Sequence, residues 1–167
     1  MNQINTPKSY LAVAIASLFA SSITQAAIDE IVVTANKREQ TLQDIPMSVS
    51  VTSGEQIAQS SIVDLIDLQS AVPALRVNQL QSSAQTNFII RGYGNGANNP
   101  GIEPAVSVYI DGVPRTRSAS SLADLPTVQR VEVLSGPQST LFGKNASAGV
   151  ISVSTLLPEQ EMGGMIE

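Results

Sequence analysis

Two glycine-containing segments of the chain carry residue types that bind phosphate in other proteins, but neither has the required spacing. Residues 136–144 resemble a P-loop, yet six residues separate the two glycines instead of four, and Asn145 replaces the Ser or Thr that binds magnesium. Residues 92–96 follow an expected strand, as a dinucleotide-binding loop does. Their third glycine comes one residue early, and a proline-containing segment follows instead of a helix. The spacing therefore argues against a nucleotide site.

The chain also lacks the side chains on which most enzymatic mechanisms depend. It contains no His and no Cys, so the commonest general base and the commonest metal ligand are both absent. A serine nucleophile would need a lysine base, and neither Lys37 nor Lys144 stands in an S-x-x-K setting. No group of Asp and Glu residues has the spacing of metal ligands. We predict that the protein is not an enzyme and has no catalytic residue, metal site or cofactor.

The overall composition is that of a folded, acidic chain. The 167 residues suffice for one domain with a core, and 43% of them are hydrophobic while 14% are charged. Nine basic and 14 acidic side chains give a net charge of −5. Because no basic stripe is present to meet phosphates, we expect no nucleic-acid partner.

The first 26 residues are typical of an export signal. Lys8 precedes an apolar run at 10–20 that is too short to span a membrane. Small residues at Thr24 and Ala26 frame a cleavage site after Ala26. A buried N-terminal helix is the alternative. The order of polar, apolar and small residues favours the signal, so the mature chain is expected to work outside the cytoplasm.

A short β-prone segment follows the expected cleavage site. The segment consists of two acidic residues, Asp29 and Glu30, followed by four residues suited to a strand, Ile31, Val32, Val33 and Thr34. We expect no partner strand for it nearby in the chain. Such a strand can add to the sheet edge of another protein, where backbone hydrogen bonds supply the affinity. It can equally be the first strand of the domain itself, and composition leaves both alternatives open.

Period-two alternation predicts short, half-buried strands along the rest of the chain, at 48–52, 87–91, 105–110, 130–134 and 149–155. The 92–101 segment holds four glycines, three asparagines and a proline, which predicts a loop. Asp111 and Gly112 predict a turn.

Three short helices are expected between the strands. Ser53 suits an N-cap with Gln56 completing a capping box, which predicts a helix that ends near residue 59. A second helix is expected from Ser61, with Asp64 at its third position, and ends before Pro73. A third begins at Pro137 and is closed by Gly143. The order β-α-α-β-β-β-α-β predicts a small α/β (or α+β) domain with a mixed sheet.

Residues 130–155, RVEVLSGPQSTLFGKNASAGVISVST, resemble the most recognisable stretch of the plug domain of TonB-dependent outer-membrane receptors. Further segments agree in the order of the family, at 88–92, at 108–114, and at 48–51 with 64–73. Residues 29–35 stand where the family keeps its TonB box. The resemblance implies a signal peptide at 1–26, a TonB box and linker at 27–45, a plug domain at 46–157 and a tail at 158–167.

The resemblance also implies partners. The plug is expected to fill a 22-stranded outer-membrane barrel and to admit a small nutrient, most often an iron–siderophore complex, when the TonB protein pulls on the box. The residues expected to bind the periplasmic domain of TonB are Asp29, Glu30, Ile31, Val32, Val33, Thr34 and Ala35. The residues expected in the ligand-facing loop are Tyr93, Asn95, Asn98 and Asn99, although a surface loop without function is the alternative.

Ionic contacts between plug and barrel are implied for Arg91, Arg130 and Glu132. The alternative for Arg130 is an internal pair with Glu132 or with an acid on a neighbouring strand. Ser135 departs from the family, which often has Arg at this position, and a serine cannot form the ionic plug–barrel contact of such an arginine.

The expected barrel does not fit into the remaining chain. Twenty-two strands need on the order of 200–240 residues before loops are counted. Only 12 residues follow the last expected plug strand. We therefore expect that the barrel comes from another chain or that the sequence is a truncated receptor. A free-standing periplasmic domain that binds TonB is the competing hypothesis.

Overall fold

The computed structural model describes residues 32–33, 40–41, 45–95, 101–121, 125 and 127–158. The expected signal peptide, and all of the expected TonB box except Val32 and Val33, lie outside these residues. The tail from 159 onward lies outside them as well.

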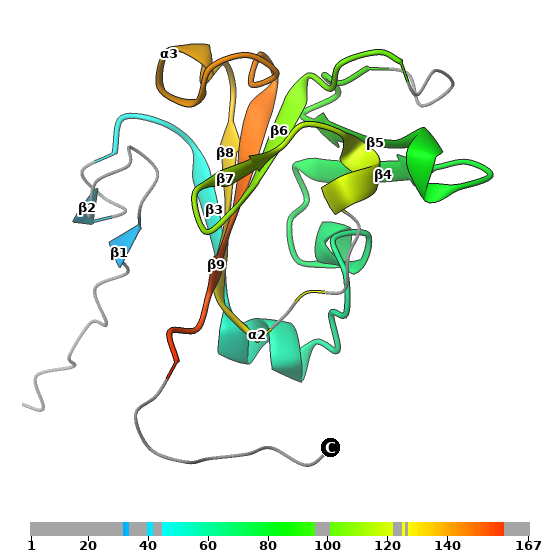
Figure 1. The fold of residues 1–167 in the computed structure, drawn as a ribbon. Helices are drawn as coiled ribbons and strands as arrows, with labels where there is room; N and C mark the ends of the chain where they lie inside the picture. The colour runs from blue at the N-terminus through cyan, green and yellow to red at the C-terminus, as the bar shows by residue number, and fades with distance from the viewer. Residues whose placement is uncertain are drawn as a thin grey trace, which may run out of the picture.

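A five-stranded mixed sheet forms the centre of the domain (Figure 1). Its strand order is β3-β8-β9-β6-β7. The strands are β3 (Val49–Ser53), β6 (Val106–Ile110), β7 (Val113–Arg115), β8 (Val128–Ser135) and β9 (Gly149–Thr155). Strands β6 and β9 are parallel and the other neighbours are antiparallel. The mixed sheet and its few short helices confirm the predicted fold class.

The main core lies on one face of this sheet. A two-stranded sheet of β4 (Leu75–Gln79) and β5 (Thr86–Ile90) stands beside that face in Figure 1. Apolar residues from both sheets and from the 57–72 segment meet there, and Val131, Val133 and Phe88 are among the most deeply buried. Since successive strand residues point to opposite faces, Leu134 of β8 faces a smaller cluster on the other side.

The first helix begins as predicted. Helix α2 (Gly54–Gln59) follows the N-cap Ser53, whose Oγ accepts the N–H of Gln56, while the Gln56 side chain accepts the N–H of Ser53. This capping box satisfies two backbone donors at the start of the helix. A Cβ at Gly54 would come within 2.2 Å of the Val128 carbonyl oxygen, so the absent side chain lets α2 lie against the start of β8.

The predicted second helix is wrong. Only a short 3₁₀ helix, Asp67–Ser70, forms in this region. One carboxylate oxygen of Asp64 accepts the N–H groups of Ile66 and Asp67 at 2.7 and 2.9 Å, which offers the backbone an alternative to an α-helix. Three apolar side chains of this region are buried nonetheless: Ile62, Leu65 and Leu68.

Other elements differ from the expectation in smaller ways. Strand β4 was not predicted, because its sequence LRVNQ is mostly polar. Helix α3 (Ser139–Phe142) starts two residues after Pro137, and Gly143 closes it at φ 77° as expected. Two further 3₁₀ helices occur, Ser83–Gln85 and Ser118–Ser121.

The expectation that the N-terminal strand has no partner nearby is also wrong. Strand β1 (Val32–Val33) pairs antiparallel with β2 (Gln40–Thr41) in a small sheet of its own. A two-residue ladder leaves one edge of β1 without a strand among the residues described, so the segment keeps the geometry needed for strand addition.

The two ends of the five-stranded sheet differ in character (Figure 1). At the loop end, α3 and residues 45–48, 91–95, 101–105 and 136–148 gather. Hydrogen bonds from Ser135 to Ser48, from Gly136 to Ala148 and from Ala148 to Ala105 tie several of them together. The helix end carries α2, the Asp111–Gly112 turn and the end of β9. None of the helices in the described part of the chain is long and apolar enough for a membrane span.

Candidate ligand-facing and partner-facing surfaces

A tight turn presents Arg91 at the loop end. The N–H of Ile90 donates to the Tyr93 carbonyl at 2.9 Å, and the N–H of Tyr93 donates back to Ile90 at 3.0 Å. Arg91 and Gly92 adopt φ of 52° and 83°, which defines a type I′ turn. The N–H of Arg91 donates to the Ala74 carbonyl oxygen at 2.9 Å, and this bond fixes the turn against the start of β4. The Arg91 side chain is exposed, and its positive φ is a strained backbone conformation for a residue with a Cβ.

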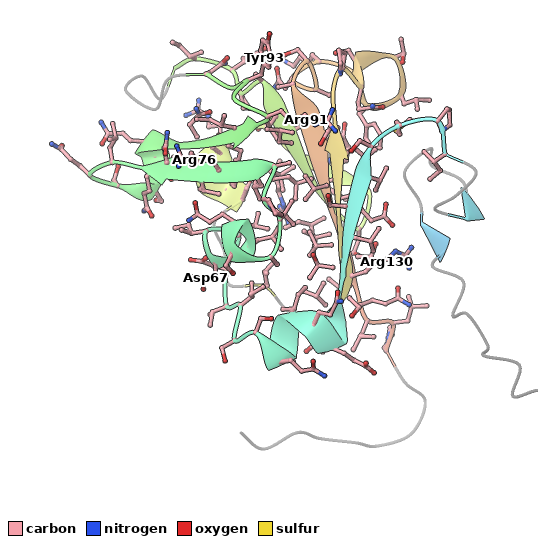
Figure 2. All side chains as sticks on the ribbon, turned by 180° about the vertical axis from the view of Figure 1, so that it is seen from behind. Asp67, Arg76, Arg91, Tyr93 and Arg130 are labelled. Atoms are coloured by element: carbon pink, nitrogen blue, oxygen red, sulfur yellow. The ribbon has the colours of Figure 1, made fainter. Side chains whose placement is uncertain are left out.

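Tyr93 leaves this turn with its ring in solvent. It is 75% exposed, the largest exposure among the aromatic side chains that the structure describes, and Figure 2 shows it at the loop end with Arg91. The next residue, Gly94, lies against β5, because a Cβ there would come within 2.6 Å of the Phe88 carbonyl oxygen. The start of the predicted loop is thus folded back over β5 while its tyrosine remains accessible.

Glu103 closes the base of the same loop. Its carbonyl oxygen accepts a hydrogen bond from Asn95 Nδ2, and its carboxylate pairs with Lys144 Nζ at 2.5 Å. Asn95 therefore has a structural contact at the predicted ligand-facing surface, whereas Asn98 and Asn99 lie outside the described residues. The sequence analysis missed Glu103 and Lys144, because 41 residues separate them along the chain.

Arg130 and Glu132 form an ion pair within the domain. Arg130 Nε and Glu132 Oε1 are 2.7 Å apart on one face of β8, and their side chains are 19% and 0% exposed. The internal pair that the sequence left as an alternative is therefore present. Arg91 is not part of it: Figure 2 shows Arg91 at the loop end and Arg130 farther along the sheet, where its register partner is Ser53. Contact of these residues with a barrel remains a prediction.

Ser135 is buried at the end of β8. It is 8% exposed, lies opposite Gly149 and donates its N–H to Ser48. The position expected to hold a contact arginine is thus used for packing at the loop end. Within the described residues, no group of three or more His, Cys, Asp or Glu side chains could hold a metal ion.

The family model "TonB-dependent Receptor Plug Domain" matches residues 41–150. The chain belongs to this family. Among its relatives, the vitamin B12 transporter BtuB of Vibrio vulnificus (strain CMCP6) is 33% identical over 95% of this chain. The pesticin receptor of Yersinia pestis is 31% identical over 82% of it.

Solved structures agree with the plug-domain fold. The ferric yersiniabactin uptake receptor FyuA from Yersinia pestis superposes with a TM-score of 0.63 at 30% identity over 69% of this chain. The ferripyoverdine receptor of Pseudomonas aeruginosa has a TM-score of 0.63 over 78% of the chain, at 20% identity, and supports the fold alone. This chain spans 27% and 20% of the two sequence relatives, and 18% and 17% of the two structures.

Proposed function

We propose that this plug domain gates a TonB-dependent receptor of the outer membrane and controls the energy-coupled uptake of a scarce nutrient. The family match over residues 41–150 carries the proposal. An iron–siderophore complex is the nutrient that we favour. Support comes from the similarity to the ferric yersiniabactin uptake receptor and to the ferrioxamine B receptor of Salmonella typhimurium. The vitamin B12 transporters among the relatives make cobalamin the second candidate.

The geometry is suited to gating because the ligand-facing and coupling features are separate. Tyr93 is exposed beside a loop whose base is closed by Asn95 and Glu103, and this surface would meet the nutrient. The N-terminal segment precedes β3 in the chain, with β2 between them, and β3 is an edge strand of the central sheet. A pull on residues 29–35 by the periplasmic domain of TonB would therefore act first on one edge of the sheet.

Contact with a surrounding barrel would use charged side chains that the domain presents. The Arg91 side chain is exposed at the loop end and forms no ion pair with another residue of the described chain. Arg130 is partly exposed and already engaged by Glu132. Arg91 is thus the better candidate for contact with a barrel carboxylate. The Arg130–Glu132 pair would instead stabilise β8 within the domain.

The experiment that tests gating replaces the N-terminal segment and plug of the yersiniabactin receptor with residues 27–158 of this chain, so that the graft carries its own expected TonB box. An unplugged barrel admits bulky hydrophilic antibiotics into the cell. We expect the graft to close this leak, and folded graft in the outer membrane that leaves the barrel open would contradict gating. A closed leak combined with binding of TonB supports a transport receptor. An open leak combined with binding of TonB would favour the competing hypothesis of a free-standing periplasmic domain.

A further inference from the structure

The carboxylate of Asp111 is bound to the last residue of the last strand. Thr155 donates its N–H to Asp111 Oδ1 at 2.8 Å and its hydroxyl to Asp111 Oδ2 at 2.9 Å. The N–H of Asp111 donates in turn to the Val153 carbonyl at 2.9 Å. Three hydrogen bonds thus join the β6–β7 turn to the end of β9, and the two that reach Thr155 span 44 residues of chain. Hydrogen bonds to an ionised acceptor are roughly twice as strong as those between neutral groups.

This end of the sheet needs such a connection because β6 and β9 are parallel. Parallel neighbours cannot be joined by a hairpin, so their equivalent ends are held together only by the ladder and by side chains. On the other side of β9, the N–H of Leu156 donates to the Thr127 carbonyl at 3.0 Å. The end of β9 is therefore fastened to elements on both of its flanks.

Strand β3, at one edge of the five-stranded sheet, lacks a connection of this kind to a second strand among the described residues. In the part of the chain that the structure describes, its one neighbouring strand is β8. The bond from the Ser135 N–H to the Ser48 carbonyl identifies Ser50 and Thr52 as the β3 residues whose backbone groups face β8. The backbone groups of Val49 and Val51 consequently face away from the sheet, so separation of β3 breaks bonds along one side of one strand.

We propose that Asp111 is a latch that keeps the end of β9 closed, so that the domain opens from its β3 edge. The remaining strands, β8, β9, β6 and β7, then stay together as one unit. The consequence for transport rests on the proposed function, because β3 is the first strand of the central sheet that a pull on the N-terminal segment reaches. The latch itself is a property of the isolated chain and can be measured without TonB or a barrel.

Amide hydrogen exchange of the purified chain tests the latch with three variants. Asp111→Gly removes the carboxylate but keeps the turn, because glycine readily adopts the φ of 49° found at this position. Asp111→Asn keeps an acceptor oxygen for the Thr155 N–H. Asp64→Ala is the matched control, since the Asp64 carboxylate likewise accepts two hydrogen bonds, both from backbone N–H groups, at a site away from β9.

We expect Asp111→Gly to speed exchange of the Thr155 amide by on the order of tenfold, the effect of losing one hydrogen bond to a charged group. Asp111→Asn should change it by less than about threefold, and Asp64→Ala should leave it unchanged. Exchange at Val113 should stay constant in Asp111→Gly, which shows that the turn is intact. A Thr155 rate within about twofold of wild type in Asp111→Gly would overturn the latch. In the wild type, the amides of Ser50 and Thr52 should exchange faster than those of Ile151 and Val153, and equal rates would overturn the order of opening.

Discussion

Two ion pairs of the domain differ in burial, and that difference decides how much each contributes to the stability of the fold. Glu132 is fully buried beside Arg130, whereas Lys144 and Glu103 are 72% and 62% exposed. Exposed pairs gain little because water and salt screen them, while a buried carboxylate depends on the donors that surround it. We therefore infer that the Arg130–Glu132 pair stabilises the fold. The Lys144–Glu103 pair instead closes the base of the loop.

The first prediction concerns the contribution of Arg130 to stability. Arg130→Ala removes a donor to a buried carboxylate and should lower the free energy of unfolding by about 1.5–3 kcal/mol. Lys144→Ala, the exposed counterpart, should lower it by less than about 1 kcal/mol. Urea denaturation of the two purified variants measures both values. Equal losses would show that burial does not distinguish the pairs.

The backbone of Arg91 provides the second prediction. A left-handed φ of 52° is strained for any residue with a Cβ, and glycine relieves the strain. Arg91→Gly should therefore be more stable than Arg91→Ala by about 1 kcal/mol, as measured by the urea midpoint. Both variants lose the guanidinium, so a difference between them reports the turn alone. Equal midpoints would argue against the strained turn.

At the scale of elements, local sequence patterns predicted what short-range forces decide. The last strand at 149–155 and the capping box of Ser53 and Gln56 follow the sequence closely, because alternation and capping are local signals. The predicted second helix does not form, because the Asp64 side chain competes for backbone N–H groups. The sequence did not predict strand β4, because three of its five residues are polar and the strand forms by pairing with β5.

The contact between α2 and β8 provides the third prediction. Gly54→Ala would place a Cβ 2.2 Å from the Val128 carbonyl oxygen, so helix or strand must shift. We expect a loss of about 1–3 kcal/mol in the free energy of unfolding, which is typical of overpacking. Gln59→Ala, an exposed change at the other end of the same helix, should stay within about 0.5 kcal/mol. Thermal and urea unfolding give the comparison, and a neutral Gly54→Ala would mean that α2 does not lie against β8.

At the scale of the whole molecule, sequence motifs indicated the family but not the contacts between distant segments. The motifs at 88–92, 108–114 and 130–155 suffice for the plug-domain assignment, and the match over residues 41–150 establishes it. The Glu103–Lys144 pair and the Asp111–Thr155 bonds span 41 and 44 residues, and no local pattern predicts them. The Arg130–Glu132 pair was foreseen only as an alternative, because residue spacing cannot tell an internal partner from an external one.

The coupling proposed for this domain depends on the N-terminal segment. Strand β1 is paired with β2 on one side, and a TonB strand would add to its other edge. Proline at position 33 removes a backbone donor and is poorly tolerated inside a ladder, so Val33→Pro should disrupt strand addition without touching the plug core.

The most direct test of the account is calorimetric binding of the purified chain to the periplasmic domain of TonB. We predict a one-to-one complex that Val33→Pro abolishes and that a peptide of residues 28–38 displaces. Leu141→Ala, an exposed change at the loop end, serves as the control and should bind as the wild type does. Absence of binding by the folded wild-type chain, or equal binding by Val33→Pro, would contradict the account.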